Sequence, residues 1–177
     1  MWLEILWRVA RPFCTGYAFL RYGSVWGMRD ALHSAPDGHS IIARVYKERL
    51  AQKGAWIGYR ARIDGTPTFP HGVFGVFISD HAVIGKNCVI FQHVTIGGEI
   101  QPDSVFQGSP IIGDNVYIGA GAKLIGGIRI GANCRIGANA TINGNLLDNT
   151  LAVCAPPRKL RITTLDRQRI DRGKAYR

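Results

Sequence analysis

Residues 111–142, IIGDNVYIGAGAKLIGGIRIGANCRIGANATI, decide the fold because a large aliphatic side chain returns at every sixth position. The members of this run are Ile112, Ile118, Leu124, Ile130, Ile136 and Ile142. An earlier run with the same period is Ile78, Ile84, Ile90 and Ile96, and a weaker copy is Ile57, Ile63 and Phe69. Within each run the residue four places later is small or β-branched, and glycine often follows the aliphatic directly.

A period of six fits neither the 3.6-residue turn of an α-helix nor the two-residue alternation of a plain strand. It is typical of a parallel β-coil with three flat faces of about six residues, each pointing one aliphatic to the axis. Glycine or asparagine turns the corners with positive φ, which explains the 22 glycines in 177 residues. The sequence therefore predicts a mainly β solenoid with one continuous core.

Two interruptions of the period predict loops that leave the coil. Ile96 and Ile112 are sixteen residues apart, which is not a multiple of six, so part of 97–111 is expected to project. Phe69 and Ile78 are nine residues apart, so about three residues are extruded beside His71. In a regular solenoid such loops are where function is often placed.

Three segments are expected. Residues 1–55 lack the repeat and are expected to be helical, with Ser40 capping a helix over 41–53 and Gly54 ending it. Residues 56–160 form the β-coil, and residues 161–177 form a basic C-terminal tail. From position 158 onward eight Lys or Arg face two Asp, so this end carries +6 of the formal charge of +10.

Charge and cysteine spacing narrow the classes of function. A basic tail suits an anionic partner, such as nucleic acid, an acidic membrane face or a phosphate-rich cofactor. Nucleic acid is disfavoured, because the chain has no helix-turn-helix or RNA-binding signature and the tail has one aromatic residue, Tyr176. We expect no metal site, since neither CxxC pairing nor Cys/His metal spacing occurs at Cys14, Cys88, Cys134 and Cys154.

The N-terminus, MWLEILWRVARPF, is apolar but interrupted by Glu4 and Arg8. It is too short to cross a bilayer and lacks the basic start and cleavage site of a signal peptide, so we expect a cytoplasmic protein. One face of an amphipathic helix could carry Trp2, Leu3, Leu6, Trp7 and Val9. Packing on the protein's own body or on a sister subunit is the simpler interpretation, and peripheral membrane contact is the alternative.

Two segments, HGVFGVFISDHAVIGKNCVIFQHVTIGG over 71–98 and the repeat over 111–142, resemble the serine acetyltransferase branch of the hexapeptide-repeat acyltransferases. The likeness covers about residues 57–160. It implies a left-handed parallel β-helix, contrary to the usual right-handed crossover. It also implies a homotrimer with active sites between the prisms, and transfer of an acetyl group from acetyl-CoA to an acceptor hydroxyl without a metal.

The resemblance makes His71 the general base that takes the proton of the acceptor hydroxyl. An imidazole pKa of about 6.5 suits that role; without the family, a satisfied loop histidine would be the simpler interpretation. His93 is expected on the same side of the prism one coil further, at a strand spacing of about 4.8 Å. It could orient His71, touch substrate, or be an exposed corner residue. His81 lies two faces away, which counts against a three-histidine zinc site.

For the donor, the resemblance implies that the pantetheine arm of CoA lies along the later coils, near the backbone of Ala120 and Ala138. Arg135, Arg158 and Lys159 could meet its phosphates, because a guanidinium or ammonium pairs readily with phosphate oxygens. Solubilising surface charge is the simpler interpretation for each of these three cations.

The acceptor side departs from the family pattern. Pro70 stands where an aspartate precedes the catalytic histidine, and Trp56 stands where an aspartate orients it. Ser109 replaces the second histidine of an RHP-type segment, and Asp64 and Glu99 remain candidates to orient the base. These losses favour the hydroxyl of a sugar or polysaccharide precursor as acceptor. L-serine acetylation and a non-catalytic β-helical scaffold are the alternatives.

Overall fold

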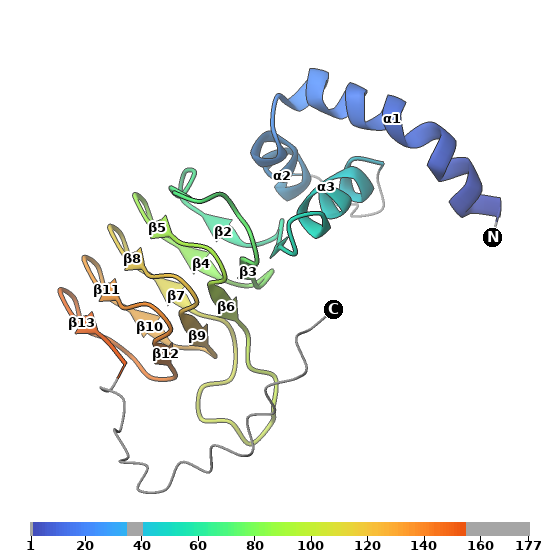
Figure 1. Cartoon of the computed structure of the whole chain (residues 1–177). Coiled ribbons are helices and arrows are strands. Elements are labelled where there is room, and N and C mark those ends of the chain that lie inside the picture. The colour runs from blue at the N-terminus through green and yellow to red at the C-terminus, as the bar shows by residue number, and fades with distance from the viewer. Residues whose placement is uncertain (1, 35–40, 155–177) are drawn as a thin grey trace, which may run out of the picture.

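The computed structural model describes residues 2–34 and 41–154, with side chains from Leu6 onward. Three helices precede the strands: α1 (Trp2–Tyr22), α2 (Val25–His33) and α3 (Ile41–Ala51). The helices gather at one end of a prism of stacked strands, and α1 is the outermost of them (Figure 1).

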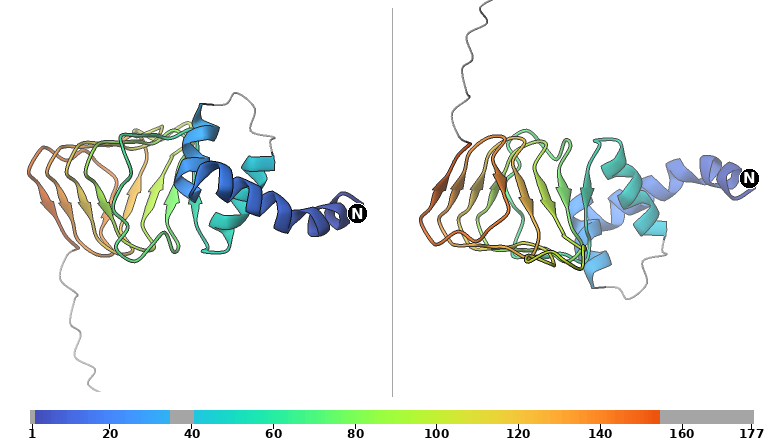
Figure 2. Two further views of the ribbon diagram at one scale, coloured as in Figure 1. Left: turned by 90° about the horizontal axis from the view of Figure 1, so that it is seen from above. Right: turned by 90° about the horizontal axis from the view of Figure 1, so that it is seen from below.

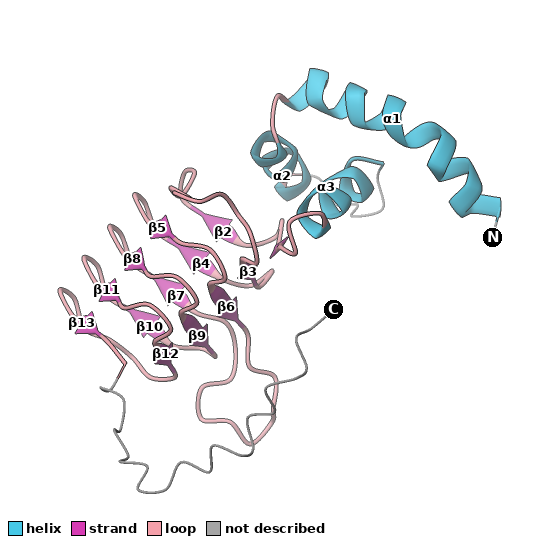
Figure 3. Cartoon of the chain, in the orientation of Figure 1, coloured by secondary structure: helices cyan, strands magenta, loops and turns pink. Residues whose placement is uncertain are grey.

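Three parallel sheets form the prism, and successive coils contribute a short strand or a single bridge to each sheet (Figure 3). The first sheet has the order β1-β3-β6-β9-β12, the second β10-β7-β4-β2, and the third β13-β11-β8-β5. Register follows the repeat, since Ile78 pairs with Ile96 and Ile96 with Leu124. The chain is a left-handed parallel β-helix, as expected. The strands are β1 (Trp56–Ile57), β2 (Arg62–Ile63), β3 (Phe77–Ile78), β4 (Val83–Ile84), β5 (Val89–Ile90), β6 (Thr95–Gly97), β7 (Ile111–Ile112), β8 (Tyr117–Ile118), β9 (Lys123–Ile125), β10 (Arg129–Ile130), β11 (Arg135–Ile136), β12 (Thr141–Ile142) and β13 (Leu151–Ala152).

The repeated aliphatics form the axial core. In the two main runs, the aliphatics from Ile78 to Ile136 are at most 2% exposed, and so are the small residues four places later, such as Ala82 and Cys88. Burial also raises the pKa of the Cys88 thiol, so this cysteine behaves as a small apolar residue. Each fully buried Leu or Ile contributes about 1.5–3 kcal/mol, which makes this stack the main stabilising element.

Asparagine turns the corner between the second and third sheets in four successive coils. We call this corner the asparagine edge; its members are Asn87, Asn115, Asn133 and Asn149, with φ of 56°, 59°, 58° and 61°. Each side-chain amide donates to the next along the prism, at 3.2, 3.1 and 3.1 Å. The left-handed backbone conformation costs most residues about 1–2 kcal/mol, and asparagine tolerates it best after glycine.

Both expected interruptions leave the coil. Residues 70–75 form a turn after the first coil. Residues 98–110 project beside the prism between β6 and β7 (Figure 1). The stem of this loop is an antiparallel bridge, in which the Glu99 N–H donates to the Gly108 carbonyl at 2.7 Å and the Gly108 N–H donates back at 2.9 Å.

The helical segment closes the open end of the core. Arg29 is 3% exposed; its guanidinium donates to the carbonyl of Ala61 and pairs with Asp30 at 2.9 Å. The Tyr46 hydroxyl donates to the carbonyl of Ile57 at 2.8 Å, and burial raises the pKa of this phenol. These bonds tie α2 and α3 to the first coil, so the first layer of aliphatics is covered.

Two helical expectations need correction. α3 ends at Ala51 rather than at residue 53, because residues 52–54 form a tight turn closed by Gly54 with φ 59°. The expected apolar face of the N-terminus is confirmed for Leu6 and Val9, which are both exposed, but not for Trp7. Trp7 packs on the core, and the Arg44 guanidinium lies 4.1 Å from its ring centroid. Ser40 lies outside the described residues, as do the side chains of residues 2–5 and the tail 161–177. No helix of the described part of the chain is long and apolar enough to cross a membrane.

Candidate active site

One edge of the prism, between the third and first sheets, carries His71 and a row of small residues. Backbone pairing runs through Thr68, Val89, Tyr117, Arg135 and Leu151, one residue in each of five coils. The residues three places after these pairs therefore form a column along the prism. We call it the histidine edge: His71, Gln92, Ala120, Ala138 and Cys154.

His71 is exposed at the head of this column. Its Nδ1 lies 2.9 Å from Oε1 of Gln92 in the next coil. A carbonyl oxygen can only accept, so Nδ1 carries the proton and donates it, which leaves the lone pair on Nε2. The ring also meets Phe91 edge to face, with centroids 5.5 Å apart and an interplanar angle of 83°. These two contacts hold the ring in place, and the unprotonated nitrogen, Nε2, is not the one bonded to Gln92.

Gln92 is the orienting residue that the sequence interpretation missed. The two carboxylate candidates do not take this place. Glu99 uses Oε1 to accept from the backbone N–H of Gln101 at 2.8 Å, inside the projecting loop. Asp64 follows β2 in the second sheet and is exposed there. Gln92 could have been identified from the register between the first two coils. Thr68 pairs with Val89, 21 residues later, and the same offset places Gln92 beside His71.

His93 lies one residue beyond the partner of His71. It turns the corner with φ 60°, and its N–H donates to the Phe74 carbonyl at 2.9 Å. Its ring lies against Gly75, where an added Cβ would come within 2.2 Å of the His93 Nδ1. His93 therefore braces the turn that carries His71, while the orienting hydrogen bond to His71 comes from Gln92.

The column below Gln92 is lined by small side chains. Ala138 is exposed, and Ala120 is partly exposed with its carbonyl bound to the N–H of Asn139 at 2.8 Å. Arg135 projects from β11 and is exposed. At about 4.8 Å per coil, the three coils from His71 to Ala138 span about 14 Å. Arg158 and Lys159 lie outside the described residues.

The three departures on the acceptor side are spread over the molecule. Pro70 is exposed directly before His71. Trp56 lies in the first sheet, with the Lys47 ammonium 5.8 Å from its ring centroid. Ser109 lies at the edge between the first and second sheets, where its Oγ is 2.9 Å from Oγ of Ser79. Within one chain, the width of the first sheet separates Ser109 from the histidine edge.

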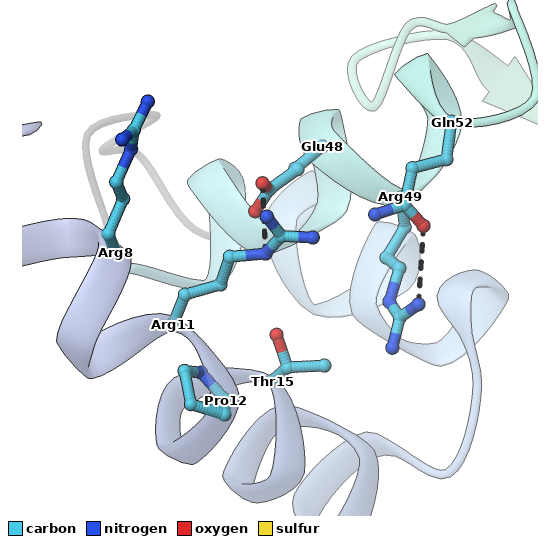
Figure 4. A pocket seen from close by; sticks show the side chains of 7 residues that line it. All are labelled: Arg8, Arg11, Pro12, Thr15, Glu48, Arg49 and Gln52. Atoms are coloured by element: carbon cyan, nitrogen blue, oxygen red, sulfur yellow. Dashed lines mark hydrogen bonds and ion pairs between the residues drawn. The ribbon is translucent and has the colours of Figure 1, made fainter.

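A polar hollow of about 400 Å³ lies elsewhere, between α1 and α3 (Figure 4). In it, Arg11 Nε pairs with Glu48 Oε1 at 3.1 Å, and Arg49 donates to Gln52 Oε1 at 3.3 Å. Its lining comes from Arg8, Arg11, Pro12, Thr15, Glu48, Arg49 and Gln52. No member of the histidine edge lines this hollow, so it is separate from the candidate site.

Comparisons with known proteins agree on the kind of fold. Residues 109–144 match the family described as bacterial transferase hexapeptide (six repeats). A serine acetyltransferase of Staphylococcus aureus is 42% identical over 87 residues, which cover 49% of this chain and 37% of that protein. A serine acetyltransferase of Synechocystis is 37% identical over 87 residues, 49% of this chain and 31% of that protein. The matched part of the chain thus spans about a third of the length of these two relatives.

A solved structure extends the likeness beyond the repeat. Neisseria gonorrhoeae serine acetyltransferase in complex with serine superimposes with a TM-score of 0.63 at 30% identity, covering 76% of this chain and 55% of that chain. Soybean serine acetyltransferase complexed with serine gives a TM-score of 0.59 at 33% identity, with the same two coverages of 76% and 55%. In its repeat, its three parallel sheets and these matches, the chain is similar to the hexapeptide-repeat transferases and, among them, to serine acetyltransferases.

Proposed function

We propose that the chain is an acetyl-CoA-dependent O-acetyltransferase in which His71 is the general base. The observation that carries this proposal is the hydrogen bond from His71 Nδ1 to Gln92, which leaves the Nε2 lone pair available at an exposed position. A general base must be held in one tautomer and be able to reach the substrate. His71 meets both requirements, because Gln92 fixes its tautomer and its side chain is exposed.

The chemistry follows from that lone pair. Nε2 takes the proton of the acceptor hydroxyl as its oxygen attacks the thioester carbonyl of acetyl-CoA. The tetrahedral oxyanion then collapses, the carbon–sulfur bond breaks, and the imidazolium returns the proton to the departing CoA thiolate. Gln92 is neutral, so it fixes the ring without the extra stabilisation of imidazolium that a carboxylate partner provides.

The donor is proposed to lie along the histidine edge. The small side chains of Ala120 and Ala138 leave room for an extended chain directly beside the column that His71 heads. Arg135 is exposed on β11, three residues before Ala138, and would meet a phosphate of CoA. A larger side chain at either alanine would fill the space that the pantetheine arm needs.

L-serine is the acceptor that the comparisons support best, because the relatives are named serine acetyltransferases and two of the solved structures hold serine. The comparisons give no support to the sugar acceptor that the altered residues favoured. A sugar hydroxyl remains the second candidate on one observation, the replacement of family residues by Trp56, Pro70 and Ser109.

The proposed assembly is a homotrimer with the site between prisms. Ser109 and His71 occupy opposite edges of the first sheet within one chain. A neighbouring prism packed against that sheet would bring its own loop edge toward the histidine edge. A molar mass of three chains in light scattering is expected, and a monomer would contradict this arrangement.

Two experiments test the proposed function. Calorimetric titration with CoA separates an enzyme from a scaffold, since no binding at millimolar CoA would defeat the enzymatic proposal. Release of CoA thiol with L-serine or with a panel of sugars then identifies the acceptor.

His71→Ala should lower kcat by about 10²–10⁴-fold while CoA affinity is kept. His81→Ala is the matched control, because His81 is an exposed histidine on another edge; unchanged turnover in His71→Ala would refute the base.

A further inference from the structure

The outer face of α1 is a continuous apolar stripe. Its five side chains are exposed by 62%, 69%, 78%, 61% and 90%, in the order Leu6, Val9, Phe13, Tyr17 and Leu20. Their spacing of three, four, four and three residues places them on one side of a helix. No charged side chain lies at these positions, so α1 presents an uninterrupted apolar face to solvent.

The stripe is not the face by which α1 packs on the rest of the chain. A different face of α1 packs on the core, through Ala18, which is 1% exposed, and through the partly buried Trp7, Cys14 and Phe19. The stripe is additional to that packing face. In both views of Figure 2, α1 extends past the other helices at the end of the molecule opposite β13. A flat surface could therefore reach the projecting part of α1 without meeting the prism.

An apolar hollow extends the same surface toward α3. It has a volume of about 460 Å³, and none of the described residues that line it is charged; they are Phe13, Cys14, Tyr17, Ala18, Ile41 and Ile42. Ile41 is itself 59% exposed. The apolar area thus continues from the stripe to the first turn of α3, with room for part of an acyl chain.

Arg21 borders this apolar area, since it is exposed on α1 four residues after Tyr17 of the stripe. Arg8 is exposed on the polar side of the same helix, where it lines the hollow of Figure 4. Residues 1–55 hold eight Lys or Arg against four Asp or Glu, within a chain of formal charge +10. An apolar stripe beside arginines is the pattern of a helix that lies in a membrane interface, with its cations at the depth of lipid phosphates.

We propose that α1 binds the surface of an anionic phospholipid bilayer, with its stripe in the acyl boundary and its arginines among the headgroups. A second copy of the chain fits less well. Two copies joined by this face would bring two cationic segments together, and the stripe offers no carboxylate to pair with them. Its five side chains are also few beside the 20–30 residues a side of a standard protein interface.

The test is co-sedimentation of the full chain with vesicles of phosphatidylcholine alone or mixed with phosphatidylglycerol. The protein should bind the anionic vesicles more strongly. Leu6→Ser/Phe13→Ser/Leu20→Ser should lower its partition coefficient by about 100-fold, because three large side chains no longer leave water. Leu147→Ser is the matched control, since Leu147 is 84% exposed at the other end of the prism. It should bind like the unaltered chain.

Two results would overturn the proposal. If the triple variant binds anionic vesicles undiminished, the binding comes from elsewhere in this basic chain. If the triple variant instead lowers the molar mass in light scattering and no variant binds vesicles, the stripe joins copies of the chain.

Circular dichroism of the triple variant should show unchanged helix content. Leu20→Ser alone, at a 90% exposed position, should still lower the partition coefficient about tenfold. Thiol release from CoA in solution should not change, so this test is independent of the proposed catalysis.

Discussion

Two edges of the prism join the same kind of strand but differ in composition. The asparagine edge repeats one residue type in four coils, and each amide donates to the next. The histidine edge has no such repetition: its positive-φ corner residues in successive coils are Gly75, His93, Gly121 and Asn139. Where the corner residue is the same in each coil, the side chains hydrogen-bond to one another. Where it varies, as on the edge that carries His71, side chains and space remain available to a substrate.

The largest expected effect on this comparison comes from filling the histidine edge. Ala138→Leu should raise the dissociation constant of CoA at least about tenfold, because the new side chain occupies the proposed donor path. The unfolding free energy should hardly change, since Ala138 is exposed. Calorimetric titration measures the affinity. Lys86→Leu is the control, because Lys86 is exposed next to the asparagine edge. If both variants bind CoA with equal affinity, the donor does not lie along the histidine edge.

A substitution in the asparagine edge should lower stability and leave the affinity for CoA unchanged. Asn133→Ala should lower the unfolding free energy by about 1–2 kcal/mol, because alanine tolerates φ 58° poorly and two amide hydrogen bonds are lost. Asn133→Gly keeps the backbone conformation without strain and should lose less. Urea denaturation gives both values. A CoA affinity or kcat that falls in these variants would contradict a purely structural edge.

A smaller change sharpens the role assigned to Gln92. In Gln92→Glu a carboxylate would accept from His71 Nδ1 and stabilise the imidazolium that forms when the base takes up a proton. The base must be neutral to act, so the acidic limb of kcat/KM against pH should move to higher pH. Activity below that limb should fall accordingly. A profile that coincides with that of the unaltered chain would show that Gln92 does not contact the base during catalysis.

The repeat predicted most of the prism, because burial of one aliphatic per face leaves a period that no helix or flat sheet shares. It could not predict the handedness of the coil, since a period of six is the same for either hand; the resemblance supplied it. The spacing from Phe69 to Ile78 correctly predicted an extruded turn beside His71.

The rest depended on packing that the sequence does not state. Gln92 was missed because the partner of His71 depends on the register between two coils, and a neutral amide carries no charge signal. In α1, apolar residues occur around most of the helix, so the face turned toward α3 is decided by tertiary contacts. Trp7 therefore turned inward while Leu6 and Val9 remained exposed.

The most direct measurement of the central claim is a double-mutant cycle in kcat/KM between His71 and Gln92. If Gln92 acts by orienting the base, Gln92→Ala should lower kcat/KM by about tenfold in the unaltered chain. In a chain that already carries His71→Ala, the same substitution should change nothing. Equal losses in both backgrounds would contradict the account, because Gln92 would then act on the reaction without His71.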